Sequence, residues 1–133
     1  MKVASSIKRY WRSRSGATAV EFALVAPIAF LLCLSVLEVG RALYTRNELA
    51  YAIDLGARRV LLDPEIADQA IHDTILLGLT ASIRAGVSIE TRIISDSQGS
   101  HRFVEASLPF TFIVPLVPQG AFVLSVRRRV PMT

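Results

Sequence analysis

The side chains that could carry out catalysis or bind a metal are few in this sequence of 133 residues, and they lie far apart. Neither of the two histidines, His72 and His101, has a partner at the spacing of a metal-ligand or nucleophilic motif. The only cysteine, Cys33, lies in an apolar stretch, where a thiol usually behaves as a small apolar residue. The sequence contains no glycine-rich phosphate-binding loop. We therefore expect a protein that is not an enzyme and that uses no cofactor and no metal.

The charged residues of the second half have structural explanations. Acids near the start of a helix are stabilised by the positive end of its dipole. Four acids lie near an expected helix start: Asp63, Glu65, Asp68 and Asp73. The run Arg127–Arg129 lies in an expected strand, so the middle side chain, that of Arg128, points away from its two neighbours. Such a run either protects an edge strand from pairing or binds an acidic partner.

The positive charge of the chain belongs to its N-terminus. Residues 1–16 contain five Lys or Arg and no acid, whereas residues 17–133 contain ten Lys or Arg and eleven Asp or Glu. A nucleic-acid-binding domain needs a basic face of its own. We therefore expect no nucleic-acid partner.

A long apolar stretch follows this basic segment. From Gly16 to Leu37 it contains one charged residue, Glu21, and as a helix its 22 residues would be about 33 Å long, enough to cross a bilayer. Basic residues beside a membrane span are retained in the cytoplasm, and the far side of the stretch lacks the cleavage site of a secretory signal. We predict three segments: a cytoplasmic leader at residues 1–16, a retained transmembrane helix at 17–38 and an extracytoplasmic domain at 39–133.

Glu21 and Pro27 are unusual inside such a helix. A carboxylate at membrane depth costs about 2.5–3.5 kcal/mol at the helix centre and less near the surface. Glu21 either lies near the interface, stabilised by the helix dipole, or has a cationic partner. If the chain were cut after Gly16, the α-amino group of Ala17 on a neighbouring subunit would supply that cation and set the stagger between packed helices. Pro27 removes one helical hydrogen bond, which predicts a kink.

The helix is expected to continue beyond the membrane to about residue 62, because apolar residues recur every three, four or seven positions. This stripe consists of Ala42, Leu49, Ile53, Gly56 and Val60. Asp54 and Arg58 are spaced for an ion pair within the helix. Arg41 is placed to pair with Glu38 at the extracytoplasmic face of the membrane.

A second helix and three strands are expected after residue 62. Asp63 followed by Pro64 predicts the N-cap and first position of a helix over residues 65–83. Apolar residues then alternate with polar ones, which predicts strands near residues 87–93, 104–114 and 122–130. Within the second strand, Pro109 indicates an edge, a bulge or a bend. The predicted fold class is therefore α+β, with an antiparallel meander whose apolar face is covered by the helices.

The N-terminal pattern resembles that of type IV prepilin-like proteins: a basic leader, Gly16, then Glu21, Phe22 and a retained apolar helix. A longer pattern is similar to that of the TadE-like family, minor pseudopilins of the tight-adherence (Flp) pilus machinery. It consists of GATAVEFALVAP at residues 16–27, LEVGR at 37–41 and GAR at 56–58. The resemblance covers about residues 14–60.

The resemblance implies a fold, a processing step and partners. The long helix would continue into a small pilin-like domain, and a prepilin peptidase would cut between Gly16 and Ala17. Glu21 and Phe22 would set the register with other pilins and pseudopilins, which would pack through the N-terminal helix. The pilus assembly platform and the lipid bilayer would be further partners. The chain would lie in a bacterial inner membrane, with its C-terminal domain in the periplasm, or be incorporated into a surface pilus.

A second hypothesis stays open from the residues alone. The chain would then be an uncleaved single-span inner-membrane protein whose periplasmic domain binds envelope partners. This hypothesis predicts a full-length chain and tolerance of Glu21→Leu.

Overall fold

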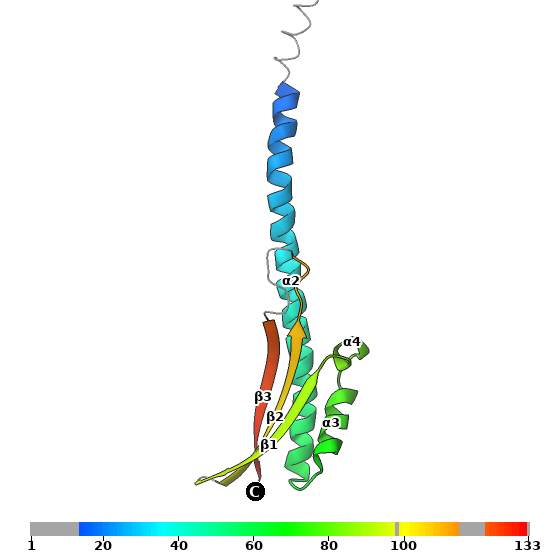
Figure 1. Ribbon diagram of the computed structural model, residues 1–133, viewed down its shortest axis with the longest axis vertical. Coiled ribbons are helices and arrows are strands. Elements are labelled where there is room, and N and C mark those ends of the chain that lie inside the picture. The colour runs from blue at the N-terminus through cyan, green and yellow to red at the C-terminus, as the bar shows by residue number, and fades with distance from the viewer. Residues whose placement is uncertain (1–13, 98, 115–121, 133) are drawn as a thin grey trace, which may run out of the picture. The chain divides into compact units, whose positions relative to one another are not determined.

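The computed structural model describes residues 14–97, 99–114 and 122–132, and the chain divides into two compact units, residues 1–37 and 38–133. Helix α2 (Arg14–Leu62) contributes residues to both units. The other described elements belong to the second unit (Figure 1): α3 (Asp68–Leu77), α4 (Ala81–Arg84), β1 (Ser88–Asp96), β2 (Gly99–Phe110) and β3 (Phe122–Met132). Most of the basic leader and the segment 115–121 between the second and third strands lie outside the described residues.

Helix α2 confirms the prediction of one long helix ending near residue 62. Its last turn is closed by the N–H of Asp63, which donates to the carbonyl of Arg59 at 3.0 Å. Leu49, Ile53 and Val60 of the predicted stripe are fully buried. Through this stripe, α2 packs into the core of the second unit.

The second helix begins later and ends earlier than the sequence predicts, so the expected helix over residues 65–83 is wrong in its bounds. The N–H of Ile66 donates to the carbonyl of Asp63 at 3.2 Å, and the N–H of Glu65 donates to Asp63 Oδ1 at 3.2 Å. Asp63 and Pro64 thus form a tight turn, with proline at its second position, instead of a helix start. Helix α3 then begins at Asp68, after Ala67 as its N-cap.

Helix α3 ends at Gly78, where the sequence predicts an uninterrupted helix. A β-carbon at Gly78 would lie 3.3 Å from the Cα of Ala52, so the chain passes unusually close to α2. The N–H of Thr80 then donates to Glu48 Oε1 on α2 at 2.6 Å. Because Thr80 is the N-cap of the short helix α4, a carboxylate of α2 partly satisfies the start of that helix.

The three strands form an antiparallel sheet in the order β1-β2-β3, which confirms the predicted meander. Strand β2 ends at Phe110, whereas alternation predicts a strand reaching residue 114. Pro109 pairs with Val123 of β3, but the pairing between β1 and β2 ends at Ser88 and Ser107. Pro109 therefore lies beyond the start of β1, at a local edge where its missing N–H costs no hydrogen bond.

The core of the second unit lies between the sheet and the helices. Figure 1 shows the strands side by side along the C-terminal part of α2, with α3 next to the same part of the helix. Ile71 and Ile75 of α3 and Val104 of β2 are fully buried there. One stripe of each helix and one face of the sheet thus close a single core.

Candidate membrane and assembly site

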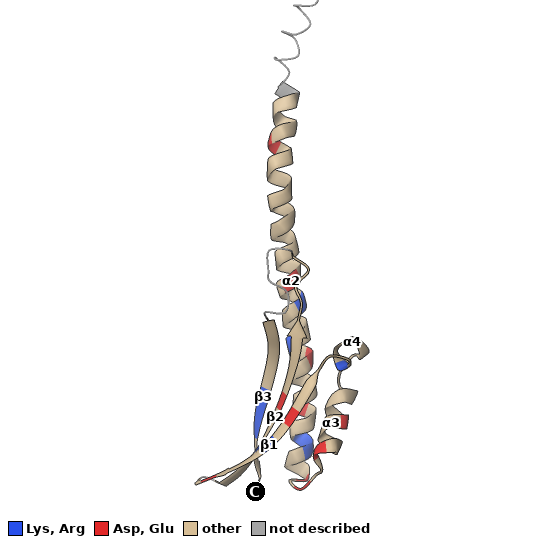
Figure 2. Cartoon of the chain, in the orientation of Figure 1, with Lys and Arg blue, Asp and Glu red and all other residues tan. Residues whose placement is uncertain are grey.

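The first unit presents an apolar helix with almost every side chain exposed. Among the described residues, one helix is long and apolar enough to cross a membrane, and an 18-residue window in it has a mean hydropathy of 2.4. Phe22, Leu24 and Phe30 are each about two-thirds exposed. Figure 2 shows how sparse charge is along this part of α2. An exposed helix that is apolar on all sides requires lipid or other apolar helices around it.

The predicted processing and assembly residues lie at the start of this helix. Gly16 and Ala17 are exposed residues in the first turns of α2, and Glu21 and Phe22 follow one turn later. Among the described residues, no ion pair to Glu21 is present. A cationic partner for Glu21 and cleavage after Gly16 both stay predictions.

Pro27 lies inside α2, and the helix continues on both sides of it. Its ring nitrogen cannot donate a hydrogen bond to the carbonyl four residues earlier. Another polar residue of the apolar helix is Ser35. Its hydroxyl donates a hydrogen bond to the carbonyl of Leu31 at 2.8 Å, the usual arrangement for serine in an apolar helix. The predicted kink at Pro27 stays a prediction.

Glu38 and Arg41 form the expected ion pair at the start of the second unit, with Arg41 Nη2 donating to Glu38 Oε2 at 2.8 Å. The pair also binds the segment after β2. The backbone N–H of Ile113 donates to Glu38 Oε2 at 3.1 Å, and Arg41 Nη2 donates to the carbonyl of Thr111. Glu38 is only 7% exposed. We call this set of contacts, made by Glu38, Arg41, Thr111 and Ile113, the Glu38 tether.

Aromatic rings support the Glu38 tether. The guanidinium carbon of Arg41 lies 4.3 Å from the centre of the Phe110 ring, a cation–π geometry. Phe110 contacts Phe112 edge to face at 5.0 Å between ring centres, and Phe112 contacts Phe122 in the same way at 5.1 Å. The tether thus joins α2 to the ends of β2 and β3. Its expected place at the membrane surface stays a prediction.

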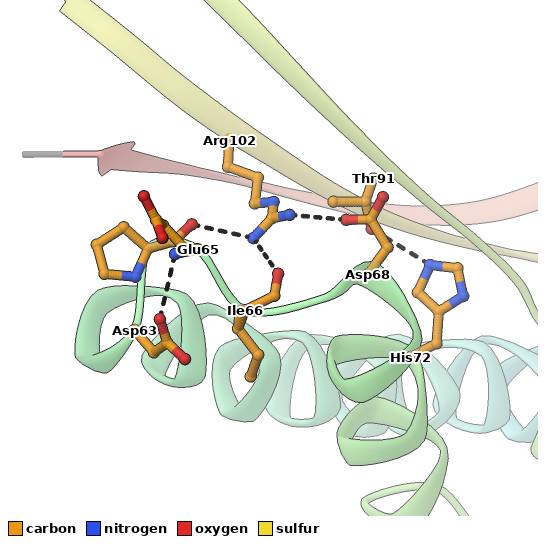
Figure 3. Close-up of polar contacts among 8 residues, drawn as sticks. Asp63, Glu65, Ile66, Asp68, His72, Thr91 and Arg102 are labelled. Atoms are coloured by element: carbon orange, nitrogen blue, oxygen red, sulfur yellow. Dashed lines mark hydrogen bonds and ion pairs between the residues drawn. The ribbon is translucent and has the colours of Figure 1, made fainter.

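Arg102 forms a second polar cluster, which the sequence analysis missed (Figure 3). Arg102 as a residue is 5% exposed, and its Nη1 donates to the carbonyls of Ile66 at 2.9 Å and of Pro64 at 3.3 Å. Its Nη2 pairs with Asp68 Oδ1 at 2.9 Å. A buried guanidinium on β2 therefore fixes the turn that connects α2 to α3.

A signal for Arg102 was available in the sequence. Alternation along β2 places it on the same face as Val104 and Ala106, both of which are fully buried. A charged residue at an inward position of a strand implies a buried partner, because an unpaired buried charge is very costly. The partner carbonyls themselves carry no sequence signal, since any residue supplies one.

The arginine run has partners on three different segments. Arg127 pairs with Glu105 at 2.7 Å, Arg128 with Asp54 of α2 at 2.6 Å and Arg129 with Asp96 at 3.6 Å. The expected pair between Asp54 and Arg58 is therefore wrong. Asp54 and Arg128 are joined by two carboxylate–guanidinium hydrogen bonds. An exposed ion pair within a helix, such as the expected pair of Asp54 and Arg58, contributes only a few tenths of a kcal/mol.

The histidines take part in contacts within the fold. His72 Nε2 lies 3.2 Å from the hydroxyl of Thr91, which joins α3 to β1 (Figure 3). His101 lies beside Arg129 across the sheet, with 2.9 Å between Nε2 and the guanidinium. Within the described ranges, His, Cys, Asp and Glu side chains form no group of three that could hold a metal ion.

Comparison with known proteins finds a similarity in the N-terminal part of the chain. The model of one family, described as TadE-like protein, matches residues 16–58. No curated protein and no solved structure matches the chain. The matched segment begins at Gly16, contains the apolar helix and Glu21, and ends within the buried stripe of α2. Over residues 16–58, this chain is therefore similar to the TadE-like family.

Proposed function

We propose that this chain is a minor pseudopilin of a tight-adherence (Flp) pilus assembly system. In this proposal a prepilin peptidase cuts between Gly16 and Ala17, and the mature chain packs with other pilins and pseudopilins through its N-terminal helix. One observation carries the proposal: the family match begins at residue 16, the glycine that precedes the predicted cut.

The exposed apolar helix supports the same proposal. Phe22, Leu24 and Phe30 have large exposed fractions, so they need lipid before assembly and helix neighbours after it. Glu21 lies among them as the one charge of the segment. In the proposed assembly, the α-amino group of a neighbouring Ala17 pairs with this carboxylate, which removes the cost of an isolated charge and fixes the stagger of the two helices.

The proposal also assigns an orientation. The five basic residues of the leader keep the N-terminus in the cytoplasm, so residues 39–133 lie in the periplasm of a bacterial inner membrane or on a pilus. Partners in this arrangement are the peptidase, the pilus assembly platform and the other pilins.

The test is the N-terminal residue of the full chain purified from membranes of cells that contain the cognate peptidase. Intact mass and terminal sequencing should show a chain that begins at Ala17. The variant Gly16→Asp should keep the leader, whereas Ser15→Ala, one position away, should be processed normally. A wild-type chain that still begins at Met1 would contradict the proposal and favour the uncleaved single-span protein.

A further inference from the structure

The two edges of the sheet differ in how they are protected against pairing. In the order β1-β2-β3, strands β1 and β3 are the outer ones. β3 carries Arg127–Arg129 and Pro131, and both arginine side chains and proline disfavour the addition of another strand. β1, with the sequence SIETRIISD, has one arginine, no lysine and no proline. The edge of β1 is therefore the one open to a partner strand.

The sequence of β1 is complementary to itself in the antiparallel direction. If two copies pair about a two-fold axis at Thr91, Glu90 of each copy lies opposite the partner's Arg92. Ile89 then lies opposite the partner's Ile93, and the two copies of Thr91 face each other. Opposite charges, β-branched pairs and threonine pairs all stabilise neighbouring strands when they lie directly opposite. A pairing shifted by one residue would turn the inward side chains of one strand to the outward face of the other.

The surroundings of β1 favour this register. Within the chain, Glu90 lies opposite another acid, Glu105 of β2, so a further cation beside Glu90 would relieve like-charge repulsion. The Arg92 of its own strand already donates to Glu90 at 2.7 Å, and Arg127 neutralises Glu105. An arginine from a partner would lie beside Glu90 on the side away from Glu105, so that each of the two neighbouring acids has an arginine on its outer side.

Exposed apolar side chains on β1 point to the same partner. Ile93 is 54% exposed and Ile94 is 49% exposed, although both lie in a regular strand. In the two-fold pairing, Ile93 gains the partner's Ile89 as a direct neighbour. The pairing therefore covers apolar surface that the single chain leaves in contact with water.

We propose that β1 pairs with β1 of a second copy about a two-fold axis at Thr91, which joins two three-stranded sheets into one of six strands. The interface is isologous, so every contact occurs twice. The pairing uses residues 88–94 alone and is independent of cleavage after Gly16 and of the packing of the apolar helices.

The experiment measures association between two differently tagged full-length chains, co-expressed and purified in mild detergent. Glu90→Arg places arginine opposite arginine, and Arg92→Glu places glutamate opposite glutamate, each twice per dimer. Each variant alone should weaken self-association by about tenfold, because two attractive pairs become repulsive. Glu90→Arg in one copy and Arg92→Glu in the other restores opposite charges at both positions, so this mixture should associate as the wild type does.

The mixture also separates the proposal from its alternatives. A variant that fails to fold would not regain association when mixed, and Ser125→Arg on the exposed face of β3 should leave association unchanged. Absence of wild-type association at tens of micromolar would overturn the proposal. Equal association of the wild type and both single variants would also overturn it, because the contact would then lie elsewhere, as in the apolar helix. The length of the mature chain is measured separately, so failure of the pseudopilin proposal leaves this result intact.

Discussion

Arg102 shows how one side chain determines a turn that local sequence leaves open. Its guanidinium is almost fully buried and holds the carbonyls of Pro64 and Ile66 together with the carboxylate of Asp68. Hydrogen bonds to a charged group contribute about 1.5–3 kcal/mol, and their loss leaves buried carbonyls without a donor. Arg102 therefore contributes more to stability than the exposed ion pairs of the sheet.

Replacing Arg102 with methionine should lower the free energy of unfolding by about 2–4 kcal/mol, since the apolar volume stays and the hydrogen bonds are lost. Urea unfolding of the full chain in mild detergent measures the change. Arg58→Met is the matched control, because Arg58 is exposed on α2 and lies outside the proposed β1 interface, and it should change the free energy by less than about 0.5 kcal/mol. Equal changes in the free energy of unfolding in the two variants would show that the buried hydrogen bonds of Arg102 stabilise the protein no more than an exposed arginine does.

Glu38→Gln should loosen the segment that follows β2. The amide side chain keeps the size of glutamate but loses the charge that attracts Arg41 and the N–H of Ile113. Hydrogen exchange of the peptide covering residues 111–114 should become faster by about tenfold, the equivalent of about 1.4 kcal/mol. Exchange in β1 should not change. A peptide 111–114 that exchanges as in the wild type would mean that the Phe110–Phe112 contacts alone hold this segment.

At the scale of elements, Gly56 sets the distance between α2 and α3. A β-carbon there would lie 2.7 Å from Cγ1 of Ile75 and 3.3 Å from Cγ2 of Ile71, so alanine requires α3 to move. Gly40, on the same helix, has open space around its Cα. The two glycines thus offer a direct comparison of packing with helix propensity.

Gly56→Ala should destabilise the protein by about 1–3 kcal/mol, because overpacking outweighs the gain in helix propensity. Gly40→Ala should stabilise it by about 0.5–1 kcal/mol, since only the propensity term applies. Thermal unfolding of both variants beside the wild type checks the signs. A stabilising Gly56→Ala would show that Ile75 adapts by rotating its side chain.

The elements were predictable from the sequence to the extent that their determinants are local. The stripe of Leu49, Ile53 and Val60 predicts α2, and alternation around Val104 predicts β2. Asp63–Pro64 fits a helix start and a turn equally well, and the choice depends on Arg102, 38 residues further along the chain from Pro64. Asp54 likewise prefers Arg128, 74 residues away, over Arg58. Long-range partners of this kind leave no trace in local periodicity.

The residues of the candidate site were likewise predictable only where their determinants lie close together in the sequence. Gly16, Ala17, Glu21 and Phe22 lie within one short stretch, residues 16–22, so their pattern could be recognised without any knowledge of the fold. The Glu38–Arg41 pair was predictable from its spacing within one helix. Its contacts with Thr111 and Ile113 were not, because they depend on how the end of β2 reaches α2.

At the scale of the whole molecule, the proposed assembly separates two roles of the N-terminal helix. Glu21→Leu should leave cleavage after Gly16 unchanged and abolish incorporation of the chain into higher-order pilin complexes, because the partner of the Ala17 amino group is lost. Co-purification with other pilins from native membranes measures the effect. Glu21→Asp keeps the charge and should retain at least part of the incorporation. Normal incorporation of Glu21→Leu would contradict a register role for this residue.

The Glu38 tether also constrains the order of events during synthesis. Its hydrogen bond joins residues 75 positions apart, and β3, which supplies Val126 and Val130 to the core, is the last described element of the chain. The ribosome therefore synthesises the whole apolar helix long before it has synthesised the residues that complete the core of the second unit. In the proposed membrane arrangement, insertion of the helix and folding of the domain are therefore separate events in time, and a nascent chain truncated before residue 122 can complete only the first.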